Sequence, residues 1–255
     1  MYRQDLDLTS PWMNAAGTLG FAPPPRWLLP EPVGAFVTNP ISLGARSPAA
    51  DRAMLPYAGG YLLHSGHPNS GLQRTLRRYA ERWAQASVPV WAHLLANSPD
   101  EVQTMVRRLE GIEGVMAVEI GLPPGARGDE ALAYVEAGFG ELPLVVSLSC
   151  AMAEEAWLKE LPGLGVSALT LSAPRGTLPG GSGRPVSGRL FGPALLPQVL
   201  AGVHAVRHLG LQVIAGAGIF RRQDAQAALD AGAYAVQLDG VLWRGWGNET
   251  AYSSS

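Results

Sequence analysis

Three glycines follow two neighbouring apolar runs near the carboxyl end of the chain, where backbone groups could bind an anion. Gly216 and Gly218 follow the run Gln212–Ala215, and Gly240 follows the run Ala235–Leu238. Backbone N–H groups can approach a phosphate closely where no side chain intervenes, so this pattern is typical of a phosphate site. The alternative is that Gly216 and Gly218 only form a tight turn. The segment by itself leaves both interpretations open.

A second group of residues carries side chains that could transfer protons. Cys150 ends an apolar run and could act as a base, although a lone cysteine is more often a small buried hydrophobe. His93 and Glu119 lie in two other apolar runs and could form an acid–base pair, or a satisfied polar pair in the core. His64 and His67 fall in a long loop, where they could contact a ligand or only face solvent.

Composition excludes several classes of protein. The chain has 255 residues, 47% hydrophobic and 16% charged, which predicts a large folded core. A net charge of −2 gives no reason to expect nucleic-acid binding, and no apolar run is long enough for a membrane span. Cys150 is the sole cysteine, so we expect a cytoplasmic protein without an intramolecular disulfide. No metal site is expected, and Trp243 with Trp246 could mark a surface for self-association or pack on the fold.

Apolar runs alternate with helical patterns along most of the chain, which predicts an α/β fold with a parallel sheet. We expect one domain over residues 1–247, a (β/α)₈ TIM barrel with an incomplete last helix, and a flexible tail over residues 248–255. The segments Pro40–Ser70 and Pro174–Gly192 are predicted to be loops, and Ala153–Leu161 is predicted to be a helix. The eight expected strands are Trp12–Asn14, Ala35–Asn39, Pro89–Leu94, Ala117–Gly121, Leu144–Ser149, Ala168–Leu171, Gln212–Ala215 and Ala235–Leu238.

Five motifs, in order along the chain, resemble the dihydroorotate dehydrogenase family. They are Met13–Phe21, Phe36–Asn39 with Arg46–Pro48, Gly66–Gly71, Ser187–Arg189 and Gly216–Ile219. The resemblance implies a (β/α)₈ barrel that binds FMN at the carboxyl ends of its strands, with a small molecule as substrate and a possible homo-oligomer. It implies that the flavin ring lies over the first strand end and that backbone groups hold the phosphate. The implied cofactor-binding residues are Ala15, Ala16, Gly17, Thr38, Asn69, Ser147, Gly188, Gly216, Gly218 and Gly240.

The chain departs from the family pattern at polar positions that carry the chemistry. Asn39 and Ser147 stand where the family has lysines, and the loop that carries the family's base reads Glu119–Pro124, without a Cys or Ser. Asp239 stands where the family has glycine beside the phosphate, and a carboxylate there would repel the anion unless Arg221, Arg222 or Arg244 pairs with it.

These departures leave two functions open. One is an FMN-dependent oxidoreductase that does not oxidise dihydroorotate at a useful rate. The other is a non-catalytic barrel that binds a phosphate-containing ligand. An aldolase or isomerase of phosphorylated substrates fits the glycine turns, but the chain offers only Lys159 for a Schiff base.

Overall fold

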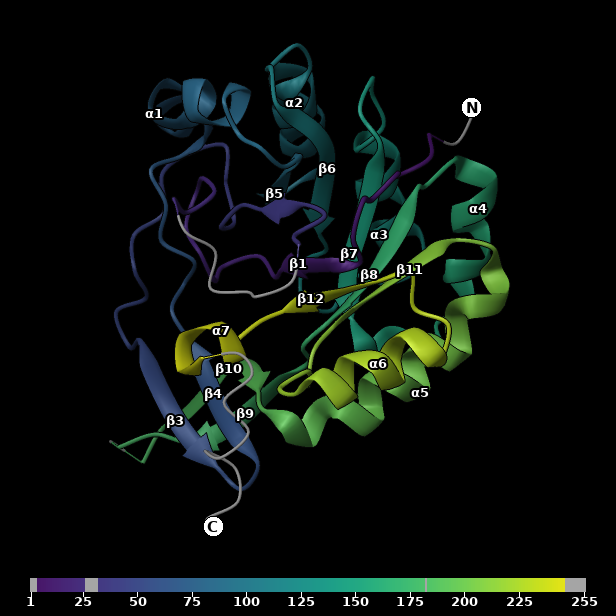
Figure 1. Cartoon of the computed structure of the whole chain (residues 1–255). Helices are drawn as coiled ribbons and strands as arrows, with labels where there is room; N and C mark the ends of the chain where they lie inside the picture. The colour runs from purple at the N-terminus through teal and green to yellow at the C-terminus, as the bar shows by residue number, and fades with distance from the viewer. Residues whose placement is uncertain (1–3, 26–31, 182, 246–255) are drawn as a thin grey trace.

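The eight expected strands form one parallel barrel. The computed structural model describes residues 4–25, 32–181 and 183–245 (Figure 1). The sheet order is β1-β12-β11-β8-β7-β6-β5-β2, and every pair within it is parallel. The strands are β1 Trp12–Asn14, β2 Phe36–Val37, β5 Val90–Leu95, β6 Val115–Gly121, β7 Leu144–Ser149, β8 Ala168–Ser172, β11 Gln212–Gly216 and β12 Ala235–Leu238. The prediction of a (β/α)₈ fold is thereby confirmed.

The barrel is closed between β1 and β2 by a side chain as well as by the backbone. Met13 and Ala35 form a parallel bridge, and the Gly34 N–H donates to the Trp12 carbonyl at 2.8 Å. One residue further along β1, the buried Asn14 amide donates to the Val37 carbonyl at 2.7 Å and accepts from the Val37 N–H at 3.0 Å. Asn14 thus satisfies the N–H and C=O of Val37 on the β1 side, while Val37 is paired with Trp91 of β5 on its other side.

Helices cover the outside of the barrel and bury the outward residues of its strands (Figure 1). Helix α2 begins as its sequence predicts, because the Ser98 hydroxyl accepts a hydrogen bond from the Glu101 N–H at 3.3 Å. The α-helices are α1 Leu72–Ala84, α2 Pro99–Leu109, α3 Asp129–Ala137, α4 Leu161–Leu164, α5 Leu196–Val206, α6 Arg222–Asp230 and α7 Val241–Arg244. The helix expected over Ala153–Leu161 is wrong in detail, since that segment contains a 3₁₀ turn, Ala156–Glu160, ahead of α4.

The two segments predicted as loops form a second sheet instead. Strands β3 Ala53–Tyr57 and β4 Gly60–His64 come from the first segment, and β9 Arg175–Pro179 and β10 Pro185–Phe191 come from the second. They make a four-stranded antiparallel sheet of order β3-β4-β10-β9, which lies at one end of the barrel in Figure 1. Because these segments contain prolines and glycines, the sequence did not predict strands there. Pairing between the two distant segments supplies the backbone hydrogen bonds of the sheet.

The end of the chain is only partly described. Helix α7 is a single short helix, and the expected tail 248–255 and Trp246 lie outside the described residues. Trp243 packs beside Tyr61 and Phe191, with ring centroids 6.5 and 6.0 Å away, and its indole N–H donates to the Thr18 carbonyl at 3.0 Å. Self-association through Trp243 stays a prediction.

We predict that Asn14→Ala lowers the free energy of unfolding by about 2–4 kcal/mol, because it leaves the buried N–H and C=O of Val37 without partners. Urea unfolding measures this change. The control is Gln73→Ala, which removes an exposed amide from α1 and should change stability by less than about 0.5 kcal/mol. Equal effects of the two substitutions would contradict the role of Asn14 in closing the barrel.

Candidate functional site

The inward residues of the barrel form an apolar layer and, above it, a polar layer. Side chains alternate along each strand, so residues two positions apart share a face. The apolar layer contains Trp91, Ala117, Val145, Ala168, Ile214 and Ala235 among its buried members. Two positions further toward the carboxyl ends of those strands stand His93, Glu119, Ser147, Thr170, Gly216 and Gln237. The polar layer therefore lies where (β/α)₈ barrels carry their chemistry.

Glu119 is the centre of this polar layer. It is 0% exposed, and its Oε2 lies 2.6 Å from Nδ1 of His93. Its Oε1 accepts hydrogen bonds from the Thr170 hydroxyl at 2.7 Å and from the Gln237 amide at 2.9 Å. Burial alone would raise the pKa of this carboxyl, but the three hydrogen bonds favour the charged form and hold the pKa below its ordinary value. The network joins β5, β6, β8 and β12 and shows that His93 and Glu119 are bonded to each other, as both alternatives for this pair require.

A large cavity, which we call the mouth cavity, opens at this end of the barrel. Its volume is about 820 Å³, which is within the usual range for small-molecule sites. His93 and Ser147 contribute to its wall, together with Gly121 and Leu122. The charged residues of its wall are Arg46, Arg127, Arg175, Arg189 and Glu130. Arg127 pairs with Glu155 at 3.4 Å, so Arg46, Arg175 and Arg189 against Glu130 leave the wall with net positive charge.

The positive charge around the mouth cavity affects the pKa of His67. It lies in the wall of the mouth cavity with its backbone at φ 51°. Burial, followed by the charges of Arg189, His93, Arg175 and Arg46, lowers the pKa of His67 to about 3. At neutral pH the His67 imidazole is therefore uncharged and can either donate or accept a hydrogen bond.

The charges of Arg189 and Asp239 interact near the mouth cavity. In the described part of the chain no hydrogen bond or ion pair joins the Arg189 guanidinium to another residue, and the group lies 5.7 Å from the centroid of the Phe191 ring. The Asp239 carboxylate is 2% exposed and reaches hydrogen-bond geometry with no described group. Burial raises the pKa of Asp239 to about 7, and the charge of Arg189 opposes that rise. Arg221, one of the arginines expected to pair with Asp239, pairs instead with Asp224 at 3.2 Å.

The structure separates the residues that the resemblance assigned to FMN. Ser147 lies in the wall of the mouth cavity. Ala16 and Gly17 line a different, small cavity of about 50 Å³, whose wall also contains Arg189, Phe191 and Trp243. The remaining implied residues line neither cavity: Ala15, Thr38, Asn69, Gly188, Gly216, Gly218 and Gly240.

Protein atoms occupy the space beside the glycines expected to hold phosphate. A Cβ on Gly240 would lie 2.2 Å from the Tyr61 hydroxyl, and one on Gly218 would lie 2.3 Å from the Leu196 N. A Cβ on Gly188 would lie 2.5 Å from the Leu63 carbonyl oxygen, because Gly188 is within β10 beside β4. Close packing of the chain against itself accounts for each of these three glycines.

The described residues consequently do not fit FMN in the orientation that the resemblance implies. The position of the ring, over Ala16 and Gly17, leaves about 50 Å³, whereas small-molecule sites usually measure at least ~300 Å³. Stacked rings of Tyr61 and Phe191, 5.2 Å apart, and the Trp243 indole pack together above that strand end. At the phosphate end, the buried Asp239 carboxylate would repel an anion.

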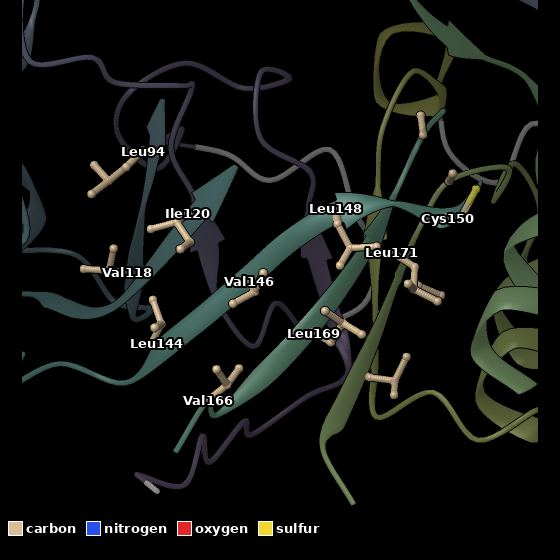
Figure 2. Packing of buried hydrophobic residues seen from close by; sticks show 14 of the residues in the cluster. Leu94, Val118, Ile120, Leu144, Val146, Leu148, Cys150, Val166, Leu169 and Leu171 are labelled. Atoms are coloured by element: carbon tan, nitrogen blue, oxygen red, sulfur yellow. The ribbon is translucent and has the colours of Figure 1, made fainter. Parts of the chain in front are cut away.

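Cys150, the third proton-transfer candidate, does not line the mouth cavity, although its neighbours Ser149 and Ala151 do. It belongs to the apolar cluster on the outside of the strands, shown with Leu148 and Leu171 in Figure 2. It is 4% exposed, and burial raises the pKa of its thiol to about 11. A protonated thiol in this environment packs as a small hydrophobe.

In residues 4–25, 32–181 and 183–245, no group of three or more His, Cys, Asp or Glu side chains is arranged to hold a metal ion. None of the described helices has the length and apolar character needed to cross a membrane.

Sequence patterns could have located more of this site. Thr170 and Gln237 stand at inward positions of apolar strands, which signals a polar layer in the barrel. Arg189, Tyr61 and Phe191 carried no such signal, because their strands were predicted as loops.

We predict that Asp239→Asn stabilises the fold at pH 8 by roughly 2–4 kcal/mol and changes it little at pH 4.5. The native pKa of about 7 exceeds the ordinary value of 3.8, so the native state holds a proton that the unfolded chain releases. Stability from this group is full below about pH 4 and is lost as pH rises to about 7. Urea unfolding at both pH values measures the change.

The control is the exposed Asp7→Asn, which should alter stability equally little at both pH values. A wild-type pH dependence that survives in Asp239→Asn would contradict the assignment.

The chain resembles known proteins over most of its length. No family model matches it. It is 29% identical to the catalytic subunit of dihydroorotate dehydrogenase B (NAD(+)) of Trichlorobacter lovleyi, over 91% of this chain and 84% of that protein. The corresponding subunit of a Geobacter species is 28% identical, over 91% and 83%. The dihydroorotate dehydrogenase of Eimeria tenella, solved with ferulenol, matches the fold with a TM-score of 0.71 at 16% identity, over 91% of this chain and 76% of that one. The chain is therefore a distant homologue of the dihydroorotate dehydrogenases.

Proposed function

We propose that this protein binds a small anionic molecule in the mouth cavity. The observation that carries this proposal is the Arg189 guanidinium in the cavity wall, which makes no hydrogen bond or ion pair with any described residue; Arg175 and Arg46 lie in the same wall. A buried or half-buried guanidinium is stable when it meets an anion, and its planar donors match carboxylate and phosphate groups. Glu155 pairs with Arg127, and Glu130 supplies one further opposing charge, which is too little to neutralise the other three arginines of the wall.

The alternative, FMN-dependent oxidation like that of the relatives, has less support. It needs a flavin beside a general base, and at the position implied for the ring Arg189, Phe191 and Trp243 line a cavity of only about 50 Å³. The loop that carries the family's base, residues 121–124, offers Gly121, Leu122, Pro123 and Pro124 to the cavity, none of which accepts a proton. Homology supports the barrel and the location of its site, and the wall of the cavity supports a different use of that site.

Binding of anions is tested by titration calorimetry of the purified protein with inorganic phosphate and with dihydroorotate, at low and at high salt. We expect saturable binding of at least one of the two that weakens at high salt. Arg189→Gln should weaken it about 10–100-fold, because charge-assisted hydrogen bonds contribute about 1.5–3 kcal/mol.

The matched control is Arg184→Gln, which removes an exposed arginine near the start of β10, outside the mouth cavity. Failure of both anions to bind, or an equal loss in both variants, would overturn the proposal.

A second prediction concerns FMN itself. The purified protein, incubated with excess FMN and desalted, should retain no flavin absorbance. Its rate of dihydroorotate oxidation with a dye acceptor should be at least about 10²–10⁴-fold below that of a flavin enzyme with its base in place. Stoichiometric retention of FMN would show that the Tyr61, Phe191 and Trp243 rings move aside, and would favour the oxidoreductase.

A further inference from the structure

Two arginines stand directly opposite each other in the small antiparallel sheet. Arg175 of β9 and Arg189 of β10 are partners in its register, and both line the mouth cavity. Directly opposite residues project from the same face of a sheet, and their Cα atoms lie about 4.5–5.5 Å apart. The next pair along this face follows the same rule, because the hydroxyl oxygens of Thr177 and Ser187 lie 2.7 Å apart. The two guanidinium groups can therefore reach the same group of a ligand.

The sheet places no carboxylate beside this pair. On its other side Arg189 is opposite Leu63 of β4, and the residues two positions away from it in β10 are Ser187 and Phe191. Among the described residues, no carboxylate forms an ion pair with Arg175 or Arg189. Like charges directly opposite each other destabilise a pair of strands. An anion held between the two arginines would remove that repulsion.

Carboxylates outside the sheet act on Arg189 without pairing with it. Burial lowers the pKa of Arg189, the charges of Asp239 and Glu119 oppose this change, and the charge of Arg175 adds to it. Glu119 already accepts three hydrogen bonds inside the barrel. Asp239 has a pKa of about 7, so it is partly protonated at neutral pH. The two arginines therefore keep most of their positive charge for a ligand.

We infer that Arg175 and Arg189, which we call the arginine clamp, bind the phosphate group of a small phosphate monoester that has an apolar organic part. This inference rests on the proposed anion binding and names its ligand class. A phosphate monoester carries about 1.5–2 negative charges at neutral pH, which matches two guanidinium groups, whereas a carboxylate matches only one. His67 is uncharged, senses the charge of both arginines and can donate a further hydrogen bond.

The rest of the mouth cavity has room for the organic part of such a ligand. The cavity measures about 820 Å³, which is more than a phosphate group alone would fill. An apolar part of its wall follows strands β6 and β7 and includes Leu122, Pro123, Leu148 and Met152. The arginine clamp belongs to the small sheet, so the charged and the apolar parts of the wall come from different elements. A ligand that contacts both has an anionic end and an apolar end.

Titration calorimetry with phenyl phosphate, inorganic phosphate and benzoate tests the arginine clamp. Phenyl phosphate and benzoate share an aromatic ring and differ in the charge of the anionic group, whereas inorganic phosphate lacks the ring. We expect phenyl phosphate to bind at least about tenfold more tightly than either of the others, since a further charge-assisted hydrogen bond or a buried ring contributes that much. Arg175→Gln should weaken binding of phenyl phosphate about 10–100-fold and binding of benzoate much less.

The stability of the ligand-free protein separates the arginine clamp from a structural role. Arg175→Gln should raise the urea midpoint at low salt, because it removes the repulsion from Arg189, even though it weakens binding. Arg175→Lys keeps the charge without the planar fork and should bind phenyl phosphate with intermediate affinity. The matched control, Arg184→Gln, removes an exposed arginine just before β10 and should change neither quantity. A lower urea midpoint in Arg175→Gln would contradict the repulsion on which the arginine clamp depends.

The three probes also distinguish failure of this inference from failure of the proposed function. If benzoate binds as tightly as phenyl phosphate, or if Arg175→Gln weakens both equally, the arginine clamp is overturned and anion binding stands. If neither these probes nor dihydroorotate binds, both proposals are overturned.

Discussion

The fully buried carboxylate of Glu119 is the constraint on which the site depends. A charge without solvent is stable only when hydrogen bonds replace the lost water, and here His93, Thr170 and Gln237 supply them from three other strands. The strands are thereby fixed in mutual register at the level of the polar layer. Removing any one donor would leave part of the charge unsatisfied, so the network constrains each of its members.

The residues that hold Glu119 also limit the space beside the backbone at Gly216. A Cβ on Gly216 would lie 3.3 Å from Cγ2 of Thr170 and 3.4 Å from Oε1 of Gln237. The space beside Gly216 is thus limited by the residues that hold Glu119, and no anion is needed to explain a glycine there. The same network holds the His93 ring through its Nδ1, and His93 also lines the mouth cavity, so the buried charge fixes one residue of the cavity wall.

The sequence predicted the barrel well because its strands carry continuous apolar runs separated by helical patterns. All eight strands, β1 to β12, were located in this way. The β3–β4 and β9–β10 pairs were missed, because strands such as Arg175–Pro179 are partly exposed and their pairing is nonlocal. Part of the site was missed for the same reason. Arg189 and Phe191 belong to β10, and they lie over the first strand end because β10 joins a sheet that the sequence did not predict.

The small antiparallel sheet explains how a homologous barrel can present a different site. In β4 and β10, the rings of Tyr61 and Phe191 stack, and Trp243 packs against both. The Tyr61 hydroxyl reaches Gly240, and Arg189 extends from the same sheet toward both cavities. Side chains of the protein thus fill the space above the first and last strands, while the space above β5, β6, β7 and β8 remains open as the mouth cavity. That open half carries His93 and the arginines Arg46, Arg175 and Arg189, so its wall combines an imidazole with positive charge.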